Sequence, residues 1–184
     1  MTATHTALKL AAFVTIVLRA QNEPGTPVEP KYINGFGAID ADGKVIELER
    51  TTVTFHTKSK VLPGYASVKM TTEFKPGHSP VRLAPNIQFV VRGRASIDPL
   101  SRYELKVLKG SKDHREFVMN QYHGSILGGS GTSNLDEGAV AIRFEEYGVH
   151  SYRITPAQSL APGEYALAVR GMPSELYCFG VDRP

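Results

Sequence analysis

The chain contains no tryptophan and only one cysteine, Cys178. A single thiol excludes an intrachain disulfide, and it also excludes a zinc site built from several cysteines. Cys178 stands between Tyr177 and Phe179 in a run that is typical of a strand, and no base stands next to it. We therefore interpret it as a small core residue rather than as a catalytic nucleophile.

A strong excess of one charge is also missing. The formal net charge is +3 and the isoelectric point is about 9.0. The densest basic stretch, Arg102–Arg115, carries Glu104 and Asp113 among its basic residues, which is typical of a solvated strand face. Nucleic-acid binding requires lysines and arginines gathered on one face, so we expect no nucleic-acid partner.

Long apolar runs are absent as well. The run Leu10–Leu18 has nine residues, too few for a transmembrane helix, so no membrane span is expected. Lys9 before this run and Ala20 after it resemble a secretory leader, although Arg19 stands where such leaders carry small residues. Either residues 1–21 are a leader of a periplasmic or extracellular protein, or they are an N-terminal strand or arm of a cytoplasmic one.

Motifs for catalysis and cofactor binding are missing from the sequence. The six histidines form no HxH or HExxH pair. The glycine-rich segment 124–138 lacks the spacing of a phosphate-binding loop, and Ser130 does not stand in a GxSxG motif. We expect no cofactor, no metal and no catalytic residue. A hydrolase with a dispersed site of histidines and carboxylates stays open as an alternative.

The pattern that is present is that of short strands and tight turns. Residues 68–74 alternate apolar and polar side chains, which is the period of a half-buried strand. Pro63-Gly64 and Pro76-Gly77 mark turns between such runs. This pattern predicts an all-β antiparallel sandwich, immunoglobulin-like or related, over residues 35–184, preceded by a proline-rich linker over residues 22–34. A barrel stays open, because the number of strands does not decide closure.

Two local details follow from the strand and turn pattern. Tyr103–Leu108 and Arg115–Met119 are expected to form a hairpin, and Pro162-Gly163 is expected to form a type II turn with positive φ at Gly163. Valine at position 163 is then expected to destabilise the fold. After this turn the side chains alternate between two faces, with Tyr165, Leu167 and Val169 on one and Glu164, Ala166, Ala168 and Arg170 on the other.

One segment has the composition of a contact loop. Residues 124–138 contain five glycines and three serines, and we interpret them as a surface loop. Tyrosine side chains stack on sugar rings, which makes a ligand- or carbohydrate-binding module an alternative function. The candidate ligand-binding residues are Tyr122, His123, Ser130 and Asn134.

Several segments together resemble a known group of proteins. They are His78–Leu83, Gln88–Val91, Tyr103–Leu108, Lys112, Arg115-Glu116, Tyr152–Pro156, Leu160–Tyr165 and Cys178–Asp182. In this order they resemble a group of uncharacterised bacterial exported β-sandwich proteins, in which a "TP..PL.PGEY" segment precedes a final "FG[IV]D" strand. The resemblance covers residues 66–183. It implies export and an immunoglobulin-like or related sandwich, and it implies no catalytic residues.

These observations favour a non-enzymatic, exported β-sandwich that acts by binding or assembly. The edge strands of a sandwich can pair with a protein partner or with another copy of the chain. An N-terminal arm, if it is retained, can add a strand to a neighbour.

Removal of residues 1–30 distinguishes the two interpretations of the N-terminus. If this segment pairs with a neighbouring molecule, the shortened chain elutes at a smaller size in size-exclusion chromatography. An unchanged oligomeric state excludes that pairing. Mass spectrometry of the natural mature protein shows directly whether residues 1–21 are removed.

Overall fold

The computed structural model describes residues 27–94, 96–125, 132–134, 136–171 and 173–183, without the side chains of residues 132–134. This part of the chain contains sixteen β-strands and one four-residue helix, α1 (Pro99–Arg102). Asp98 caps the helix by accepting a hydrogen bond from the Leu100 amide at 3.0 Å. The all-β class expected from the sequence is confirmed.

Five antiparallel strands form an outer sheet. In spatial order they are β13 (Ile142–Gly148), β14 (Ser151–Pro156), β7 (Gln88–Arg92), β1 (Phe36–Ile39) and β2 (Val45–Glu47). The registers of all four pairs are antiparallel, with a bulge between Glu146 and Gly148.

A second, central sheet lies against the outer sheet. Its strands are β12 (Ala139–Val140), β8 (Tyr103–Val107), β15 (Gly163–Val169), β16 (Glu175–Val181) and β3 (Glu49–Thr52), and β6 (Arg82–Leu83) pairs with β16 in parallel. Between the two sheets, Phe89 and Ile154 of the outer sheet and Leu167 and Phe179 of the central sheet are fully buried. The predicted antiparallel sandwich is therefore confirmed.

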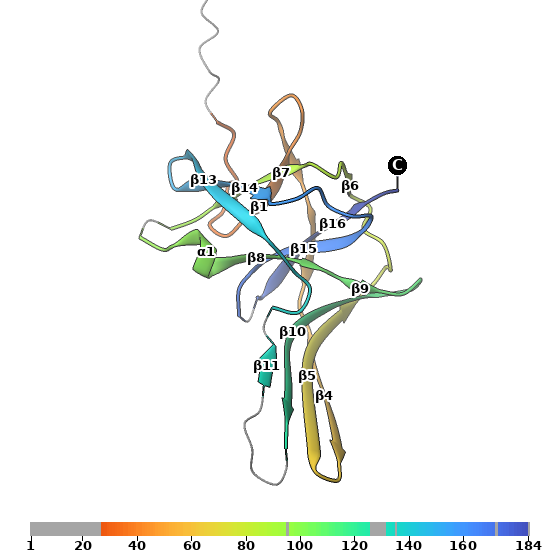
Figure 1. The fold of residues 1–184 in the computed structure, drawn as a ribbon. Helices are drawn as coiled ribbons and strands as arrows, with labels where there is room; N and C mark the ends of the chain where they lie inside the picture. Colours follow the sequence, from red (N-terminus) through yellow and green to blue (C-terminus); the bar gives the residue numbers. More distant parts are fainter. Residues whose placement is uncertain (1–26, 95, 126–131, 135, 172, 184) are drawn as a thin grey trace, which may run out of the picture.

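The remaining strands form an arm that projects from the sandwich (Figure 1). They are β11 (Thr132–Asn134), β10 (Arg115–Gly124), β5 (Tyr65–Phe74) and β4 (Phe55–Leu62), and β9 (Lys109–Gly110) pairs with the start of β10. At the tip, Leu62 pairs with Tyr65 across Pro63-Gly64, where Gly64 has a φ of 77°. The turn predicted at this position is confirmed.

The base of the arm covers the second face of the central sheet. Phe117 and Met119 of β10 belong to a second core that also contains Ala166, Ala168, Leu176 and Cys178 of the central sheet. The face assignment predicted for β15 is correct, since Tyr165 and Leu167 enter the first core and the alanines enter the second. Strand β15 is thus buried on both faces, and the molecule has three layers where two were expected.

The expected hairpin of residues 103–119 is wrong. Strand β8 pairs with β12 and β15, whereas β10 pairs with β5, β9 and β11. The two strands lie in different layers, β8 in the central sheet and β10 in the arm. Between the layers the buried Lys106 ammonium of β8 donates a hydrogen bond to the Val118 carbonyl of β10 at 3.1 Å. The chain crosses from the central sheet to the arm between Val107 and Lys109.

The expected positive φ at Gly163 is also wrong. Gly163 is the first residue of β15 and pairs with Val181, and it is not among the glycines with positive φ. The strand pairing extends to Gly163 and holds its backbone in the extended region. A Cβ atom there would lie 3.7 Å from the ring of Tyr165, an ordinary contact, so the predicted conformational penalty for valine has no basis.

The segment around Gly163 instead holds a tyrosine corner. The Tyr165 hydroxyl donates a hydrogen bond to the Ala161 carbonyl at 2.6 Å, four residues earlier in the chain. The Tyr165 ring also stacks on Phe179 in the first core, with ring centroids 5.4 Å apart. Through these two contacts the Tyr165 side chain connects the loop that precedes β15 to the first core of the sandwich.

Replacement of Tyr165 by phenylalanine tests the corner. We expect the free energy of unfolding to fall by about 1 kcal/mol, because the hydrogen bond from the Tyr165 hydroxyl to the Ala161 carbonyl is lost while the packing is kept. Urea denaturation measures this change. Tyr122→Phe is the control, since Tyr122 lies on the arm and is 41% exposed. Equal stability of the Tyr165 variant and the wild type would contradict the assignment.

Candidate functional site

A buried arginine joins the arm to the central sheet. Arg115 begins β10, and its side chain is fully buried. Its guanidinium donates two hydrogen bonds to the Glu49 carboxylate, both at 2.7 Å, and one to the Pro76 carbonyl at 2.8 Å. The guanidinium also lies 4.8 Å from the ring centroid of Phe74. This bidentate geometry fixes orientation as well as charge.

A second carboxylate, Glu164, continues the network from β15. Its Oε2 accepts the Ser79 amide at 2.8 Å and lies 3.7 Å from the Arg115 guanidinium. Its Oε1 accepts a hydrogen bond from Arg82 at 2.5 Å and lies 3.4 Å from Nδ1 of His78. Glu164 is only 8% exposed, and the donors Arg82 and the Ser79 amide compensate the charge of its buried carboxylate.

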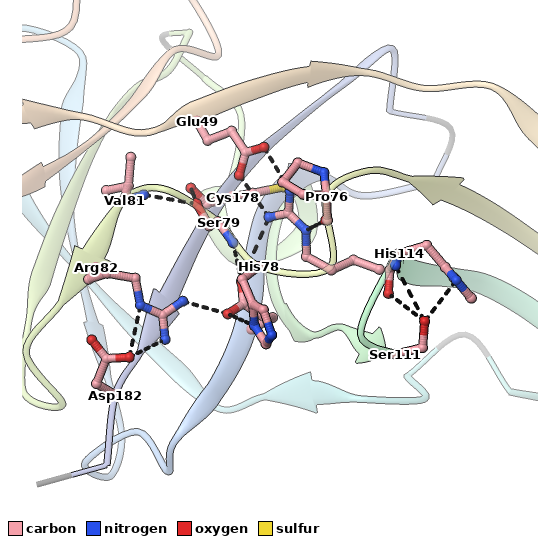
Figure 2. Close-up of polar contacts among 12 residues, drawn as sticks. Glu49, Pro76, His78, Ser79, Val81, Arg82, Ser111, His114, Cys178 and Asp182 are labelled. Atoms are coloured by element: carbon pink, nitrogen blue, oxygen red, sulfur yellow. Dashed lines mark hydrogen bonds and ion pairs between the residues drawn. The ribbon is translucent and has the colours of Figure 1, made fainter.

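Arg82 extends the network to the C-terminal strand. Its guanidinium donates to the Asp182 carboxylate at 3.1 and 2.7 Å (Figure 2). It lies directly over Gly180, where an added Cβ atom would come within 1.6 Å of its Nη1. The absence of a side chain at Gly180 therefore leaves space for Arg82, which binds Asp182 two residues later in the same segment.

An open cleft lies at this network. Its volume is about 550 Å³, and it is lined by His78, Ser79, Arg82, Pro162, Gly163, Glu164, Val181, Asp182 and Arg183. Three separate segments of the sequence, residues 78–83, 160–165 and 178–182, thus meet in one place. Sequence spacing alone could not show this, because the segments lie about 80 residues apart or come from different strands of the sheet.

The cleft brings a histidine and a carboxylate together, which is the geometry that a dispersed hydrolase site requires. Both oxygens of Glu164, however, are already engaged by Arg82 and by the Ser79 amide. The Ser79 hydroxyl donates to the Cys178 carbonyl at 3.4 Å and accepts the Val81 amide at 3.2 Å. Burial raises the pKa of the Cys178 thiol to about 12, which keeps it protonated. The arrangement favours a structural clamp over a nucleophile with its base.

A serine–histidine contact lies in the loop before β10. The Ser111 hydroxyl and Nδ1 of His114 are 2.8 Å apart (Figure 2). The Ser111 hydroxyl also accepts hydrogen bonds from the amides of Asp113 and His114. These bonds close a turn within four residues. No group of three or more histidine, cysteine, aspartate or glutamate side chains in the described ranges could hold a metal ion.

The charges of the network perturb the protonation of its members. Burial alone would raise the pKa of Glu49, but hydrogen bonds from Arg115 and Ser79 and the charge of Arg115 outweigh it and hold that pKa below its ordinary value. Burial lowers the pKa of Arg115, and the hydrogen bonds and charge of Glu49 more than reverse this effect, so the guanidinium stays charged.

The predicted ligand-binding residues lie on the arm, away from the cleft. Tyr122 and His123 are neighbours on β10 and therefore point to opposite faces of the arm. His123 bonds to the Tyr65 hydroxyl through Nδ1, and the two rings stack with centroids 5.9 Å apart. Asn134 lies on β11 opposite Gln121, and Ser130 lies outside the described residues. The structure does not bring the side chains of Tyr122 and His123 into one pocket.

The arm presents two different surfaces. One face carries ion pairs, with Lys58 2.5 Å from Glu73 and Lys69 paired with Glu116. Apolar side chains are exposed on both faces towards the tip: Leu62 and Tyr65 lie on the ion-pair face, and Val61, Val68 and Tyr122 lie on the opposite face. All eight residues of β4 are exposed, and this strand is one edge of the arm sheet.

Comparisons with known proteins found no relative. No family model, no curated protein and no solved structure matches the chain. Within the described ranges, no helix has the length and apolar character needed to cross a membrane.

Arg115→Met tests the clamp at the root of the arm. We expect a loss of about 3 kcal/mol in the free energy of unfolding at pH 7, because the partly buried Glu49 carboxylate loses its counter-charge, whereas Glu164 keeps Arg82. In the wild type the low pKa of Glu49 contributes stability above about pH 4.3, and this contribution is lost as the pH falls through the lower pKa of the folded state.

Urea denaturation between pH 7 and pH 3 measures both effects. In the Arg115 variant, burial without a counter-charge raises the pKa of Glu49, so the acid-induced loss of stability becomes smaller. Arg50→Met is the matched control, because Arg50 forms an exposed ion pair with Glu175 and its removal has little effect. Identical behaviour of the two variants would exclude a clamp at Arg115.

Proposed function

We propose that this chain is a non-enzymatic, exported protein that works by binding or assembly, and that its arm is the contacting element. The observation that carries this proposal is strand β4, an eight-residue edge that is exposed along its whole length. Such an edge presents unpaired backbone groups to a partner strand.

The side chains near the tip support a role in contact. Val61 is 68% exposed and Leu62 is 46% exposed, next to Tyr65 at 38%. These apolar groups are in neither core, and they lie on both faces at the end of a projecting element, Val61 on one and Leu62 and Tyr65 on the other. Exposed apolar residues gathered in this way are typical of interaction sites.

The rigid attachment of the arm supports the same proposal. A guanidinium that is held by Glu49 and by the Pro76 carbonyl keeps the base of β10 in one orientation relative to the central sheet. A contact element on a fixed support loses less conformational entropy when it binds than a flexible one does.

Export and an immunoglobulin-like relationship belong to the proposal as well. The tyrosine corner at Tyr165 is a feature of immunoglobulin-like sandwiches and supports that relationship. Export rests on the resemblance of residues 66–183 to exported proteins and on the leader-like character of residues 1–21.

Serine at positions 61 and 62 tests the contact function. We expect wild-type association, measured by sedimentation velocity from about 1 to 100 µM, to be lost in Val61→Ser/Leu62→Ser, because apolar area is no longer removed from water. Thermal stability stays unchanged, since both side chains are exposed in the folded molecule.

Val28→Ser/Ile33→Ser is the matched control, because these two residues are 53% and 51% exposed on the body. Loss of association in the control, or its persistence in the arm variant, would contradict the proposal. So would turnover of a substrate that disappears when His78 or Glu164 is replaced.

A further inference from the structure

The sheets of the described chain end in edges of very different length. Four of the six terminal strands, β2, β3, β11 and β12, have two to four residues. The other two are long, with eight residues in β4 and seven in β13. Only edges of this length offer a full set of backbone groups to a partner strand.

Two copies of β4 are poorly suited to pair with each other. Residues that oppose each other in a sheet lie on the same face, so a symmetric antiparallel pair opposes residues whose numbers differ by an even amount. The two registers with the longest overlap place Lys58 opposite Lys58 or Lys58 opposite Lys60. Like charges in these positions are destabilising, which argues against a symmetric β4 dimer.

The polar face of the arm carries an uncompensated positive charge. Lys58, Lys60 and Lys69 lie on this face with Glu73 and Glu116, and the ion pairs join Lys58 and Lys69 to the two glutamates. Lys60 forms no ion pair with a described residue. A partner strand with a carboxylate would complete the row.

Strand β13 has the complementary character. Arg143, Glu145 and Glu146 are exposed, and neither glutamate forms an ion pair within the described ranges. Glu145 stands opposite Arg153 of β14, whereas Glu146 stands opposite Tyr152 and has no cation directly across the strand pair. The two long edges of one molecule therefore carry opposite charges.

We propose that β4 of one molecule pairs with β13 of the next, so that copies of this chain associate head to tail. This inference rests on the proposed function and names the partner as a second copy. In the antiparallel register that opposes Lys58 to Glu146, Lys60 is diagonal to the same carboxylate, and both distances are within reach of lysine side chains.

The placement of the two edges decides the type of assembly. Strand β13 lies on the sandwich, and β4 lies on the arm that projects away from it (Figure 1). The contact joins different surfaces of the two molecules, so a third molecule can add to either end. Such a contact gives an open series of copies rather than a closed dimer.

A charge exchange between the two edges tests the proposal. Lys58→Glu/Lys60→Glu and Glu145→Lys/Glu146→Lys are each expected to weaken self-association about tenfold, because attraction becomes repulsion across the pair. An equimolar mixture of the two variants is expected to regain wild-type association, since each mismatched edge then meets its complement. Wild-type association weakens in 0.5 M salt.

Sedimentation velocity on the full-length chain gives these values, and thermal denaturation verifies that each variant is folded. Lys75→Glu/Lys112→Glu is the control, because both lysines are exposed and lie off the two edges. The proposal is overturned if the wild type stays monomeric at 100 µM, if the single-edge variants associate like the wild type, or if their mixture does not regain association.

Two further results distinguish this proposal from two alternatives, a contact through the N-terminal segment and a contact of the arm with a surface other than β13. Association that survives the charge changes and disappears when residues 1–30 are removed assigns the contact to the N-terminal segment and overturns the β4–β13 pairing. Association that is lost in Val61→Ser/Leu62→Ser and unaffected by the charge changes keeps the arm as the contact element and rejects β13 as its partner.

Discussion

The fold depends on one buried charge, the guanidinium of Arg115. It stands where the arm meets the central sheet, and it bonds to Glu49 of β3 and to the carbonyl of Pro76. A buried charge without partners would be strongly unfavourable, so only a relative position of arm and sheet that keeps these bonds is stable. The contacts of Phe117 with β15 and β16 bury apolar surface, whereas the directional hydrogen bonds of the guanidinium fix the orientation of the arm relative to the central sheet.

The strands and several turns could be predicted from the chain, because these features depend on near neighbours. Alternation in residues 68–74 and the Pro63-Gly64 turn carry local signals of period and φ. The two errors have tertiary causes. Strand pairing with Val181 holds Gly163 extended against its turn signal, and the layer change after Val107 separates two runs that look like one hairpin.

The cleft shows the same limit for a site. His78, Arg82, Glu164 and Asp182 lie in separate segments of the sequence, and nothing in their spacing indicates that they share one network. The only local hint is Gly180, two residues before Asp182. Its role becomes clear only from the structure, in which Arg82 lies over it. Tyr122 and His123 are predicted ligand-binding residues because they stand next to a glycine-rich segment, but the pleat of β10 directs their side chains to opposite faces.

What the sequence by itself determined is the all-β class, the positions of most strands and the absence of recognisable catalytic motifs. Those properties follow from side-chain period, turn chemistry and residue type, which act over a few positions. The tertiary structure alone decided the third layer, the projecting arm and the opposite charges of the β4 and β13 edges. These depend on which strands pair, and pairing between distant segments is set by the burial of both faces of β15, which no local pattern records.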